Sequence, residues 1–484
     1  MNSSEISKAI LAALKEYDIA NIQNSTITPP CDDKLSVDAF YIKQQSIEGI
    51  FDSMDEAIEA SVIAQRHYQM CSMADRDRFI TGIRETFLNE SILEQISKLA
   101  VEETGMGCYE HKIIKNRLAA QKTPGIEDLI TNAMSGDSGL TLVEYSPYGV
   151  IGSITPTTNP TETIICNTIG MLAAGNAIVF SPHPRSKNVA LLAIKLINQK
   201  LASLGAPANI VVTVSNPSID NTTALMRHKA VKMLVVTGGP CVVEAVMTSG
   251  KKVIAAGAGN PPVVVDETAD TKKAAIDIIN GCSFDNNLPS IAEKEVIVVD
   301  QVADFLTHCM QVNGGYLLSD TATIRQLMEL VLNDKGVPKT EFIGKSASYL
   351  LAKLGIRDVK NIKVIIMEVT KDHPFVLQEL MMPILPIVRV NDVDDAINLA
   401  IKVEHDNRHT AIMHSNDVGR LTKMAKLIQT TIFVKNGPSY SGIGLGGEGY
   451  ATFTIAGPTG EGLTSARSFA RARRCVMVEA LNIR

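Results

Sequence analysis

The hydrophobic and polar positions of the chain follow helical spacing first and an alternation of strands and helices afterwards. Apolar residues recur at helical spacing through residues 52–120, which predicts that this stretch is helical throughout. From residue 139 the pattern changes, because residues 140–145 alternate apolar and polar side chains as a strand does. Strands and helices then take turns at 177–180, 186–203, 209–214, 231–236 and from Pro240 onward. This alternation predicts parallel βαβ units.

The alternation restarts after about residue 257 and predicts a second α/β lobe. Its strands are expected at 262–266, 295–299 and 363–367, and its helices at 270–280, 301–312, 393–404 and 416–428. The chain has 484 residues, whereas single hydrophobic cores stop growing near roughly 250–300 residues. Two large lobes are therefore the expected architecture.

Both ends of the chain carry an element that stands apart from these lobes. Ser4 can cap a helix over residues 3–17 whose apolar side chains share one stripe, and the polar stretch 21–33 suggests a tether. The stripe is a candidate docking face for a partner, and packing on its own domain is the alternative. The strand expected at 475–478 could form an intersubunit arm with residues 140–146, although an ordinary edge strand fits equally well.

Composition and charge narrow the class of function. The chain is 45% hydrophobic and 20% charged, with a formal net charge of -6 and a sequence pI of about 5.9. These values are ordinary for a globular protein and lack the basic surplus of a nucleic-acid surface. None of the 8 cysteines has metal-ligand spacing, which predicts reduced thiols in a cytoplasmic protein without a metal site. No apolar run is long enough to cross a bilayer, so no membrane partner is expected.

Several segments carry candidate chemistry. They are the loop that ends at Asn159, the SPHP run at 181–184, the TGG turn at 237–239, the crossover 255–262 (expected to be flexible), the run 280–295, the QELMMP run at 378–383 and the glycine-rich stretch 436–449. A loop asparagine can donate into an oxyanion hole, although such residues more often stabilise turns. Glycines before a helix favour a phosphate, although most such turns are structural.

The order of these segments resembles the aldehyde dehydrogenase superfamily from about residue 40 to the end. The runs FDNNLP, AAGAGNPPVVVD and VEHDNRHTA are similar to the CoA-acylating acetaldehyde and propionaldehyde dehydrogenases of bacterial microcompartments. The resemblance implies an α/β aldehyde dehydrogenase fold with a Rossmann-like cofactor domain, an α/β catalytic domain and a small oligomerisation arm. The implied parts are an encapsulation-type helix at 1–20, a tether at 21–40, an NAD- and CoA-binding domain at 41–256 with 139–147 in the arm, a catalytic domain at 257–440, and a C-terminal segment at 441–484 that returns to the cofactor domain and arm.

The resemblance also implies the site. Ser290 falls where the family carries its nucleophilic cysteine, and Asn159 with the backbone N–H of 290 falls at the oxyanion hole. Glu379 matches the glutamate that holds the nicotinamide ribose. The remaining implied cofactor residues are Thr155, Pro156, Ser181, Pro182, Thr237, Gly238, Gly239 and Gly257. Hydrolytic relatives typically have lysine near Ser181, so the choice between NAD and NADP stays open. The implied cofactors are NAD and, as co-substrate, coenzyme A.

Two departures from hydrolytic relatives matter. The crossover 255–259 contains no carboxylate, whereas those enzymes carry a glutamate base there. Water has a pKa of about 15.7 and needs that base, whereas a thiol with a pKa of roughly 8.5 ionises with little help. The second departure is Ser290, because a serine hydroxyl is a poor nucleophile without an adjacent base. The chain as written is therefore expected to be nearly inactive, through an introduced cysteine-to-serine substitution or as a natural inactive paralogue.

The function indicated is NAD-dependent oxidation of propionaldehyde or acetaldehyde to acyl-CoA through a covalent thioester. A hydrolytic dehydrogenase and a non-catalytic microcompartment cargo protein are the alternatives. Cys282 is expected to be a buried structural thiol, and His405 and His409 to support the second lobe. By resemblance, the N-terminal helix would bind shell or cargo proteins, which places a homo-oligomer in the cytoplasm inside a microcompartment.

Overall fold

The computed structural model describes residues 48–357 and 360–483. The predicted N-terminal helix and its tether lie outside the described residues. These described residues belong to one compact unit by their contacts. Among the described helices, none is both long and apolar enough to span a bilayer.

The first lobe is built on a six-stranded parallel sheet in the order β1-β6-β5-β4-β7-β8. Its strands are β1 (Ile50–Phe51), β4 (Val150–Thr155), β5 (Ala177–Pro182), β6 (Val211–Val214), β7 (Val231–Thr237) and β8 (Lys252–Ala256). The predicted strands at 177–180, 209–214 and 231–236 are confirmed to within two residues. Strands β1 and β8 were not predicted, because β1 has only two residues and the last two residues of β8, Ala255 and Ala256, were assigned to the glycine crossover.

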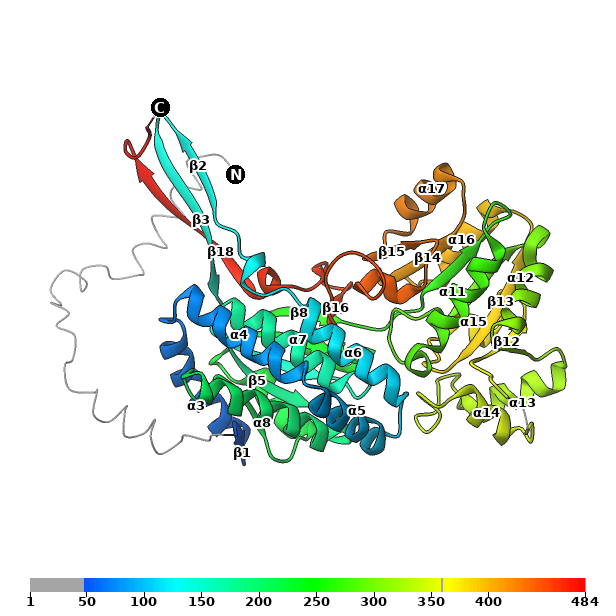
Figure 1. The fold of residues 1–484 in the computed structure, drawn as a ribbon, viewed down its shortest axis with the longest axis horizontal. Coiled ribbons are helices and arrows are strands. Elements are labelled where there is room, and N and C mark those ends of the chain that lie inside the picture. The colour runs from blue at the N-terminus through cyan, green and yellow to red at the C-terminus, as the bar shows by residue number, and fades with distance from the viewer. Residues whose placement is uncertain (1–47, 358–359, 484) are drawn as a thin grey trace, which may run out of the picture. The chain divides into compact units, whose positions relative to one another are not determined.

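The helices of the first lobe pack around this sheet (Figure 1). They are α3 (Met54–Tyr68), α4 (Met73–Phe87), α5 (Glu90–Thr104), α6 (Tyr109–Lys122), α7 (Pro160–Ala173), α8 (Lys187–Ser203), α9 (Ile219–Arg227) and α10 (Pro240–Met247). The helical stretch 52–120 is confirmed and divides into four helices. Ser53, Ser72 and Asn89 cap the first three with their side chains, which sets where each begins. Every residue of α7 is buried, so this helix lies inside the lobe.

The second lobe holds a seven-stranded parallel sheet in the order β11-β12-β13-β10-β9-β14-β15. Its strands are β9 (Pro262–Val265), β10 (Glu295–Val299), β11 (Gly315–Leu317), β12 (Val364–Glu368), β13 (Ile384–Val390), β14 (Thr410–His414) and β15 (Ile432–Lys435). Its helices are α11 (Thr271–Ser283), α12 (Asp300–Val312), α13 (Thr321–Val331), α14 (Ala347–Lys353), α15 (Pro374–Leu377), α16 (Val393–Val403) and α17 (Val418–Ile428). The predicted strands of this lobe are confirmed, and β11, β13, β14 and β15 were missed.

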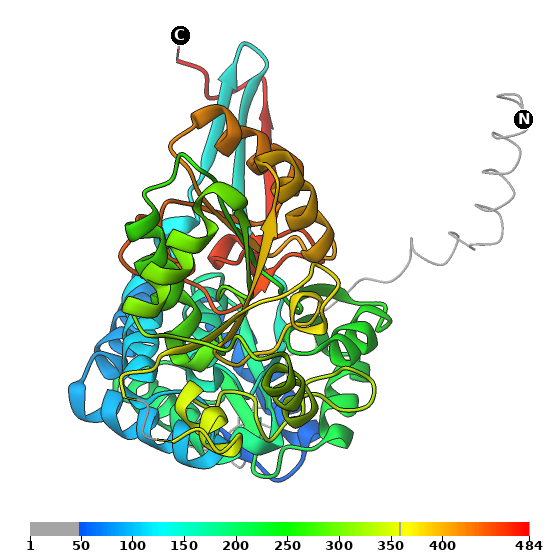
Figure 2. The same ribbon diagram turned by 90° about the vertical axis from the view of Figure 1, so that its right-hand side faces the viewer.

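A separate three-stranded antiparallel sheet joins the C-terminal strand to the middle of the chain. β18 (Ala470–Val478) pairs with β3 (Gly139–Pro147) along its full length, and β3 pairs with β2 (Asn132–Gly136). Figures 1 and 2 both show β18 beside β3. The strand expected at 475–478 therefore has its partner within the same chain, in the segment that the sequence suggested for a shared arm.

The crossover between the lobes is more ordered than the sequence indicated. Ala255 and Ala256 end β8, Pro262 begins β9, and Gly259 and Asn260 are buried between them. The Asn260 side chain donates to the carbonyls of Val376 and Val403, at 3.1 and 2.9 Å. The expectation of a flexible crossover is therefore wrong for residues 255–262, because buried strand ends and amide hydrogen bonds hold them.

Candidate active site

The carboxyl ends of β4, β5 and β7 meet at one edge of the first sheet. β4 lies between the other two, and Thr155 stands opposite Pro182 in the register. Thr237 ends β7 at the same edge. Open α/β sheets bind ligands beyond the carboxyl ends of their strands. The Thr155 hydroxyl is buried and has no hydrogen-bond partner among the described residues, so a bound water or ligand is needed to satisfy it.

The turn from β7 into α10 leaves a helix N-terminus open. Gly239 is the N-cap residue, Pro240 occupies the first turn, and no side chain caps the helix. A β-carbon added to Gly239 would meet nothing within 4 Å. Uncapped N–H groups at a helix start attract phosphate groups. The 237–239 turn therefore fits the pyrophosphate of a dinucleotide. Thr237 is held by the Thr454 hydroxyl at 3.0 Å.

The other residues expected to line the cofactor path are buried or partly buried, whereas Gly239 is exposed. Ser181 is buried and its hydroxyl lies 2.8 Å from that of Thr222, so it already has a protein partner. Pro156 is partly buried just after β4. Gly257 follows β8, and a β-carbon there would lie 3.4 Å from Cγ of Pro458.

Ser290 follows a turn of three residues with left-handed backbone. Asp285, Asn286 and Asn287 have φ values of 49, 53 and 66°. Asparagine and aspartate adopt this region more readily than other residues with a side chain. The run FDNN therefore encodes a backbone shape, which sets the path into Pro289 and Ser290.

The side chains of all three residues in this turn form hydrogen bonds that hold it in place. Cys108 donates its backbone N–H to Oδ1 of Asp285 at 2.8 Å. The Asn286 amide donates to the carbonyls of Gly107 and Gly344 at 3.0 and 2.9 Å. The Asn287 amide donates to the carbonyls of Cys282 and Glu293, both at 2.9 Å. The turn is thus tied to both lobes.

Ser290 also lies against the crossover. A β-carbon on Gly259 would lie 2.7 Å from the Ser290 carbonyl oxygen and 2.9 Å from Cγ of His409. The backbone N–H of Gly259 in turn faces the Glu379 carboxylate and lowers its pKa. Glu379 and the crossover therefore lie near Ser290. Within residues 48–357 and 360–483, no carboxylate accepts a hydrogen bond from the Ser290 hydroxyl.

Glu379 and Lys294 form a mostly buried pair beside this junction. Lys294 Nζ lies 4.0 Å from Oε1 of Glu379 and donates to Oδ1 of Asn287 at 2.6 Å. Burial raises the pKa of Glu379, against the opposing effects of Lys294 and the Gly259 N–H. Burial likewise lowers the pKa of Lys294, against the effect of Glu379. The lysine therefore links the turn before Ser290 to the glutamate expected at the cofactor.

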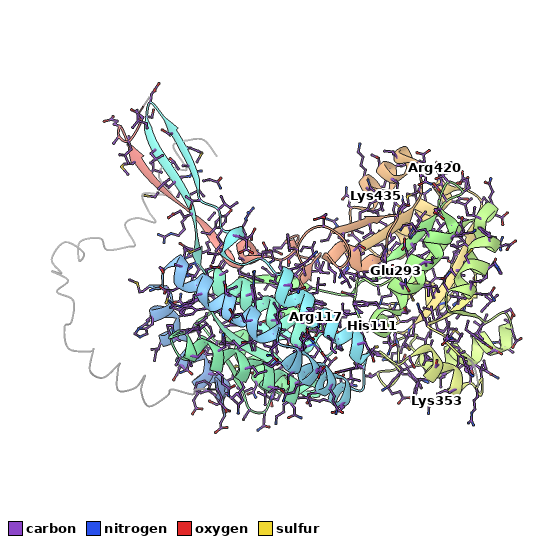
Figure 3. The ribbon with its side chains drawn as sticks, in the orientation of Figure 1. His111, Arg117, Glu293, Lys353, Arg420 and Lys435 are labelled. Carbon is purple, nitrogen blue, oxygen red and sulfur yellow. The ribbon has the colours of Figure 1, made fainter. Side chains whose placement is uncertain are left out.

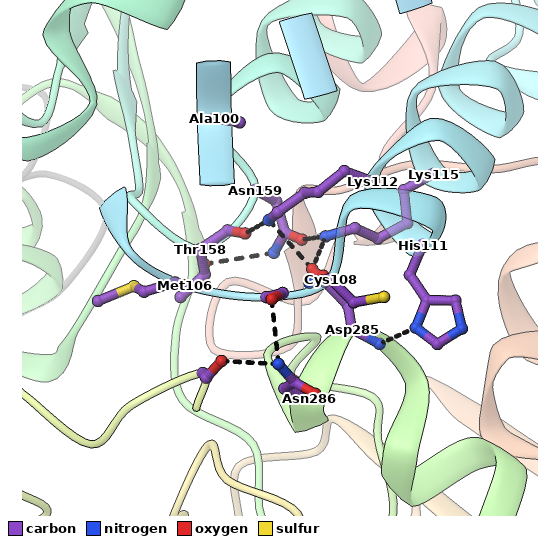
Figure 4. A network of polar contacts seen from close by, with 12 residues as sticks. Ala100, Met106, Cys108, His111, Lys112, Lys115, Thr158, Asn159, Asp285 and Asn286 are labelled. Carbon is purple, nitrogen blue, oxygen red and sulfur yellow. Dashed lines mark hydrogen bonds and ion pairs between the residues drawn. The ribbon is translucent and has the colours of Figure 1, made fainter. Parts of the chain in front are cut away.

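Asn159 precedes α7 and does not cap that helix with its side chain. Its Oδ1 accepts a hydrogen bond from Nζ of Lys115 at 2.5 Å (Figure 4). Among the described residues, the Thr158 hydroxyl at 3.3 Å is the one acceptor for its Nδ2. The side chain is almost wholly buried.

Lys115 belongs to a buried network of two lysines and two carboxylates. Its Nζ lies 2.5 Å from Oδ2 of Asp285 and 3.0 Å from Oε1 of Glu162. Lys112 lies 3.0 Å from the same Asp285 oxygen and donates to the Thr158 carbonyl at 2.5 Å. All four charged side chains are at most 1% exposed. The charges balance within the network, as buried charges require.

The pKa values within this network favour the charged forms at its centre. Burial alone would lower the pKa of Lys115, but Asp285 and Glu162 outweigh it and the pKa is raised. Burial alone would raise the pKa of Asp285, but Lys112 and Lys115 outweigh it and the pKa is lowered. Lys112 has a lowered pKa, because burial dominates there.

His405, His409 and Cys282 differ in burial and in their hydrogen-bond partners. His405 is exposed, and its Nε2 contacts the Leu377 carbonyl at 3.1 Å. His409 is buried against Gly259, and its Nδ1 lies 2.8 Å from the Thr410 hydroxyl. Burial, aided by Lys294, lowers the pKa of His409 to about 4. Cys282 is confirmed as a buried thiol, and burial raises its pKa.

A cavity of about 600 Å³ lies beside the left-handed turn, and Phe284 and Asn286 line it. His111, which is labelled in Figure 3, lines the cavity, accepts the backbone N–H of Asp285 at 2.9 Å and packs its ring against Phe284. Ser290 does not line this cavity. The described residues contain no group of histidine, cysteine and carboxylate side chains suited to a metal ion.

The chain belongs to the aldehyde dehydrogenase family. The family model matches residues 48–313. Among curated relatives, the propanal dehydrogenase (CoA-propanoylating) of Salmonella typhimurium is 48% identical over 485 residues, covering 100% of both chains. The acetaldehyde dehydrogenase (acetylating) EutE of Escherichia coli is 47% identical over 442 residues, covering 90% of this chain and 93% of that one.

Solved structures show the same fold. A Rhodopseudomonas palustris propionaldehyde dehydrogenase with bound CoA and an acylated cysteine superposes with a TM-score of 0.89 and 69% identity, over 90% of this chain and 100% of that one. An engineered glycolyl-CoA reductase with bound NADP+ has a TM-score of 0.90 and 68% identity, over 91% and 100%. A cysteine-to-alanine mutant of propionaldehyde dehydrogenase from the fucose utilisation microcompartment of Clostridium phytofermentans has a TM-score of 0.87 and 52% identity, over 90% and 100%. The fold predicted from the sequence is confirmed.

Sequence reasoning did not find Lys112, Lys115, Glu162 or Asp285. The available signal was the pair of lysines three residues apart in a helix, which places both on one face. A second signal was Glu162, a carboxylate inside an otherwise apolar and hydroxyl-rich helix. Neither signal identifies its partners, which lie up to 173 residues away along the chain (112 to 285).

Proposed function

We propose that the chain is built for NAD-dependent, CoA-acylating oxidation of a short aliphatic aldehyde, propionaldehyde or acetaldehyde, to its acyl-CoA. The observation that carries the proposal is the packing of a carboxylate-free crossover directly against residue 290. The CoA-linked names of the relatives with high identity support the same reaction class.

In this proposal the side chain at 290 forms the covalent bond to substrate. A thiolate at this position adds to the aldehyde carbon, and the carbonyl oxygen becomes an oxyanion. Nδ2 of Asn159 and the backbone N–H of residue 290 are the proposed donors to that oxygen. Such donors stabilise the charge most when they are fixed and excluded from water, and Asn159 is 7% exposed.

The cofactor would lie along the carboxyl edge of the first sheet. Bound NAD supplies the acceptor for the hydride that leaves the substrate carbon. The 237–239 turn would bind its pyrophosphate, and Thr155, Pro156, Ser181, Pro182 and Gly257 would line its path. Glu379 would hold the nicotinamide ribose, and its place beside Gly259 supports that role.

Transfer of the acyl group to sulfur follows from the missing base. The thioester at residue 290 is attacked by the thiol of CoA, its bond to the side chain breaks, and the thiolate is regenerated. Water would need a general base for the same attack, because its pKa is about seven units above that of a thiol. The described residues offer the residue-290 side chain no hydrogen-bonded carboxylate, so hydrolysis lacks its catalyst.

The serine at 290 is proposed to suppress this chemistry in the chain as written. A serine hydroxyl is nucleophilic only beside a general base, and His409 is bonded to Thr410 rather than to Ser290. An introduced cysteine-to-serine substitution is the favoured origin, and a natural inactive cargo protein is the alternative.

Replacing Ser290 by cysteine tests the proposal. The Ser290→Cys enzyme should form acyl-CoA from propionaldehyde, NAD and CoA, and release NADH in equal amount. The chain as written should show less than about 1% of that rate, since it lacks an activated nucleophile. Failure of Ser290→Cys to raise the rate would refute the proposal. Free propionate as the main product in the presence of CoA would favour the hydrolytic alternative.

The assembly and location of the protein are also proposed. The sheet of β2, β3 and β18 would serve as an oligomerisation arm in a dimer or tetramer. Its outer strand supports this, because Val476, Met477 and Val478 are exposed apolar residues. The N-terminal helix would bind microcompartment shell or cargo proteins, as the origin of one relative suggests.

A further inference from the structure

We infer that Lys115 is a positioning residue that fixes which end of the Asn159 amide faces the substrate oxygen. This inference rests on the proposed function, in which Asn159 donates to an oxyanion. It concerns a side chain that touches neither substrate nor cofactor and acts through Asn159.

The argument begins with the two ends of an asparagine side chain. Oδ1 and Nδ2 are similar in size, so an amide can rotate by 180° with little change in packing. With Nδ2 toward the substrate oxygen, the amide stabilises an oxyanion. With Oδ1 there, an acceptor faces a negative charge and repels it. Catalysis therefore requires an interaction that selects the orientation with Nδ2 toward the substrate oxygen.

The hydrogen bond from Lys115 to Asn159 selects this orientation. An ammonium group has three donors and no acceptor, so the atom that Lys115 meets at 2.5 Å must be Oδ1 of Asn159. Nδ2 is then directed away from Lys115. The one hydrogen bond that Nδ2 donates within the described part of the chain goes to the Thr158 hydroxyl, at the long distance of 3.3 Å. This leaves Nδ2 with a proton available for another acceptor.

The surrounding carboxylates keep Lys115 in its charged form. A neutral amine could accept a hydrogen bond from Nδ2 and would permit the wrong orientation. Asp285 at 2.5 Å and Glu162 at 3.0 Å stabilise the ammonium form in a site without solvent. Figure 4 shows Lys115 between Asn159 and Asp285.

The same ammonium group also links the oxyanion donor to the turn before residue 290. Asp285 is the first of the three left-handed residues, and four residues separate it from Ser290. Lys115 thus donates a hydrogen bond to Asn159 in the first lobe and forms an ion pair with Asp285 in the second. One side chain sets the relative position of the donor and the nucleophile-bearing turn.

Lys112 provides a matched comparison. It is equally buried and shares Asp285 with Lys115. However, its hydrogen bond runs to the backbone carbonyl of Thr158 and not to the Asn159 side chain. Loss of Lys112 should therefore affect the stability of the network without releasing the amide.

The test uses the full-length Ser290→Cys enzyme and two charge-neutral pairs of substitutions. One pair is Lys115→Met with Glu162→Gln, and the other is Lys112→Met with Glu162→Gln. Each removes one positive and one negative charge, so neither leaves an uncompensated buried ion. The first pair should lower kcat about a hundredfold, the usual effect of losing an oxyanion donor, with little change in KM. The second should lower kcat by no more than about threefold at a similar melting temperature.

A double-mutant comparison separates positioning from general damage. Adding Asn159→Ala to the Lys115 pair should cost no more than about a further threefold, because the amide is already misdirected. Adding it to the Lys112 pair should cost about a hundredfold. Equal losses of kcat in the two pairs, or an additive effect of Asn159→Ala on the Lys115 pair, would overturn the inference.

A single conservative variant covers the case in which a pair does not fold. In Lys115→Arg, the side chain stays a cation with donors only and can still donate to Oδ1 of Asn159. It should retain at least about tenfold more activity than Lys115→Met, and equal activity of these two variants would also overturn the inference. An inactive Ser290→Cys parent would refute the proposed function and the inference with it. An active parent with indistinguishable lysine variants would refute the inference alone.

Discussion

Gly259 and Ser290 are packed so closely that a β-carbon on the glycine would lie 2.7 Å from the serine carbonyl oxygen. Real β-carbons do not approach other atoms this closely, and the carbonyl belongs to backbone that cannot rotate away. The crossover at this point has no room for any side chain. The crossover carries no carboxylate side chain. Its backbone nevertheless fixes the position of residue 290 through this tight contact.

Adding one methyl group at Gly259 should therefore destabilise the protein. We expect Gly259→Ala to lower the free energy of unfolding by about 1–3 kcal/mol, the usual cost of overpacking, and to lower the melting temperature accordingly. Gly136→Ala is the matched control, because a β-carbon there meets nothing within 4 Å. Equal melting temperatures for the two variants would contradict the packing described for the crossover.

The left-handed backbone at Asn287 predicts that its alanine variant is less stable than its glycine variant. Its side chain makes two donor bonds and accepts one from Lys294, so either truncation should cost about 2–4 kcal/mol. Asn287→Ala should be worse than Asn287→Gly by about 1 kcal/mol, because alanine is strained at a φ of 66° and glycine is not. Urea unfolding of both variants checks this order, and a more stable alanine variant would exclude backbone strain as a factor.

Glu293 predicts a pH dependence of stability. Its carboxylate accepts the N–H and hydroxyl of Ser439 at 2.8 and 2.7 Å, yet burial raises its pKa from 4.5 to about 7. Between these pH values the unfolded chain loses this proton and the folded chain keeps it, so stability falls as pH rises through the window. The difference is about 3 kcal/mol when complete.

Glu293→Gln should remove this loss, because glutamine keeps the shape and an acceptor for the Ser439 N–H. We expect the variant to be more stable than the parent at pH 8 and similar to it near pH 4.5. Melting temperatures measured across that range test the expectation, with the exposed Glu59→Gln as control. A parallel pH profile for Glu293→Gln and its parent would show that Glu293 is ionised in the folded state throughout.

Much of the architecture could be predicted because it is written in local patterns. The alternation of apolar strands and helices identified both lobes, and the runs FDNNLP and AAGAGNPPVVVD identified the family. β8 was missed because its residues Ala255 and Ala256 begin a glycine-rich run, and glycine usually signals a break in structure. Burial in the first lobe overrides that local preference.

The electrostatic part of the site could not be predicted from local patterns. Lys115 and Asp285 are 170 residues apart (115 to 285), and each alone has the appearance of a surface charge. Only the packing of α6 against the left-handed turn shows that both are buried and paired. A single sequence gives no indication of pairing between distant residues, so this network required the structure.

The N-terminal segment offers a prediction that does not involve the active site. Deletion of residues 1–20 should leave the melting temperature and the activity of the Ser290→Cys enzyme unchanged, because the described unit begins after this segment. The deletion should abolish co-purification with microcompartment shells. Shell association that survives the deletion would place the targeting signal elsewhere in the chain.

The central claim is that an acyl group formed at residue 290 is transferred to sulfur because no base activates water. A rapid-mixing experiment with Ser290→Cys, propionaldehyde and NAD in the absence of CoA tests it most directly. We predict a burst of about one NADH per active site, then a much slower steady release, with full turnover restored by CoA. Continuous turnover without CoA, at a rate similar to that with CoA, would contradict the account.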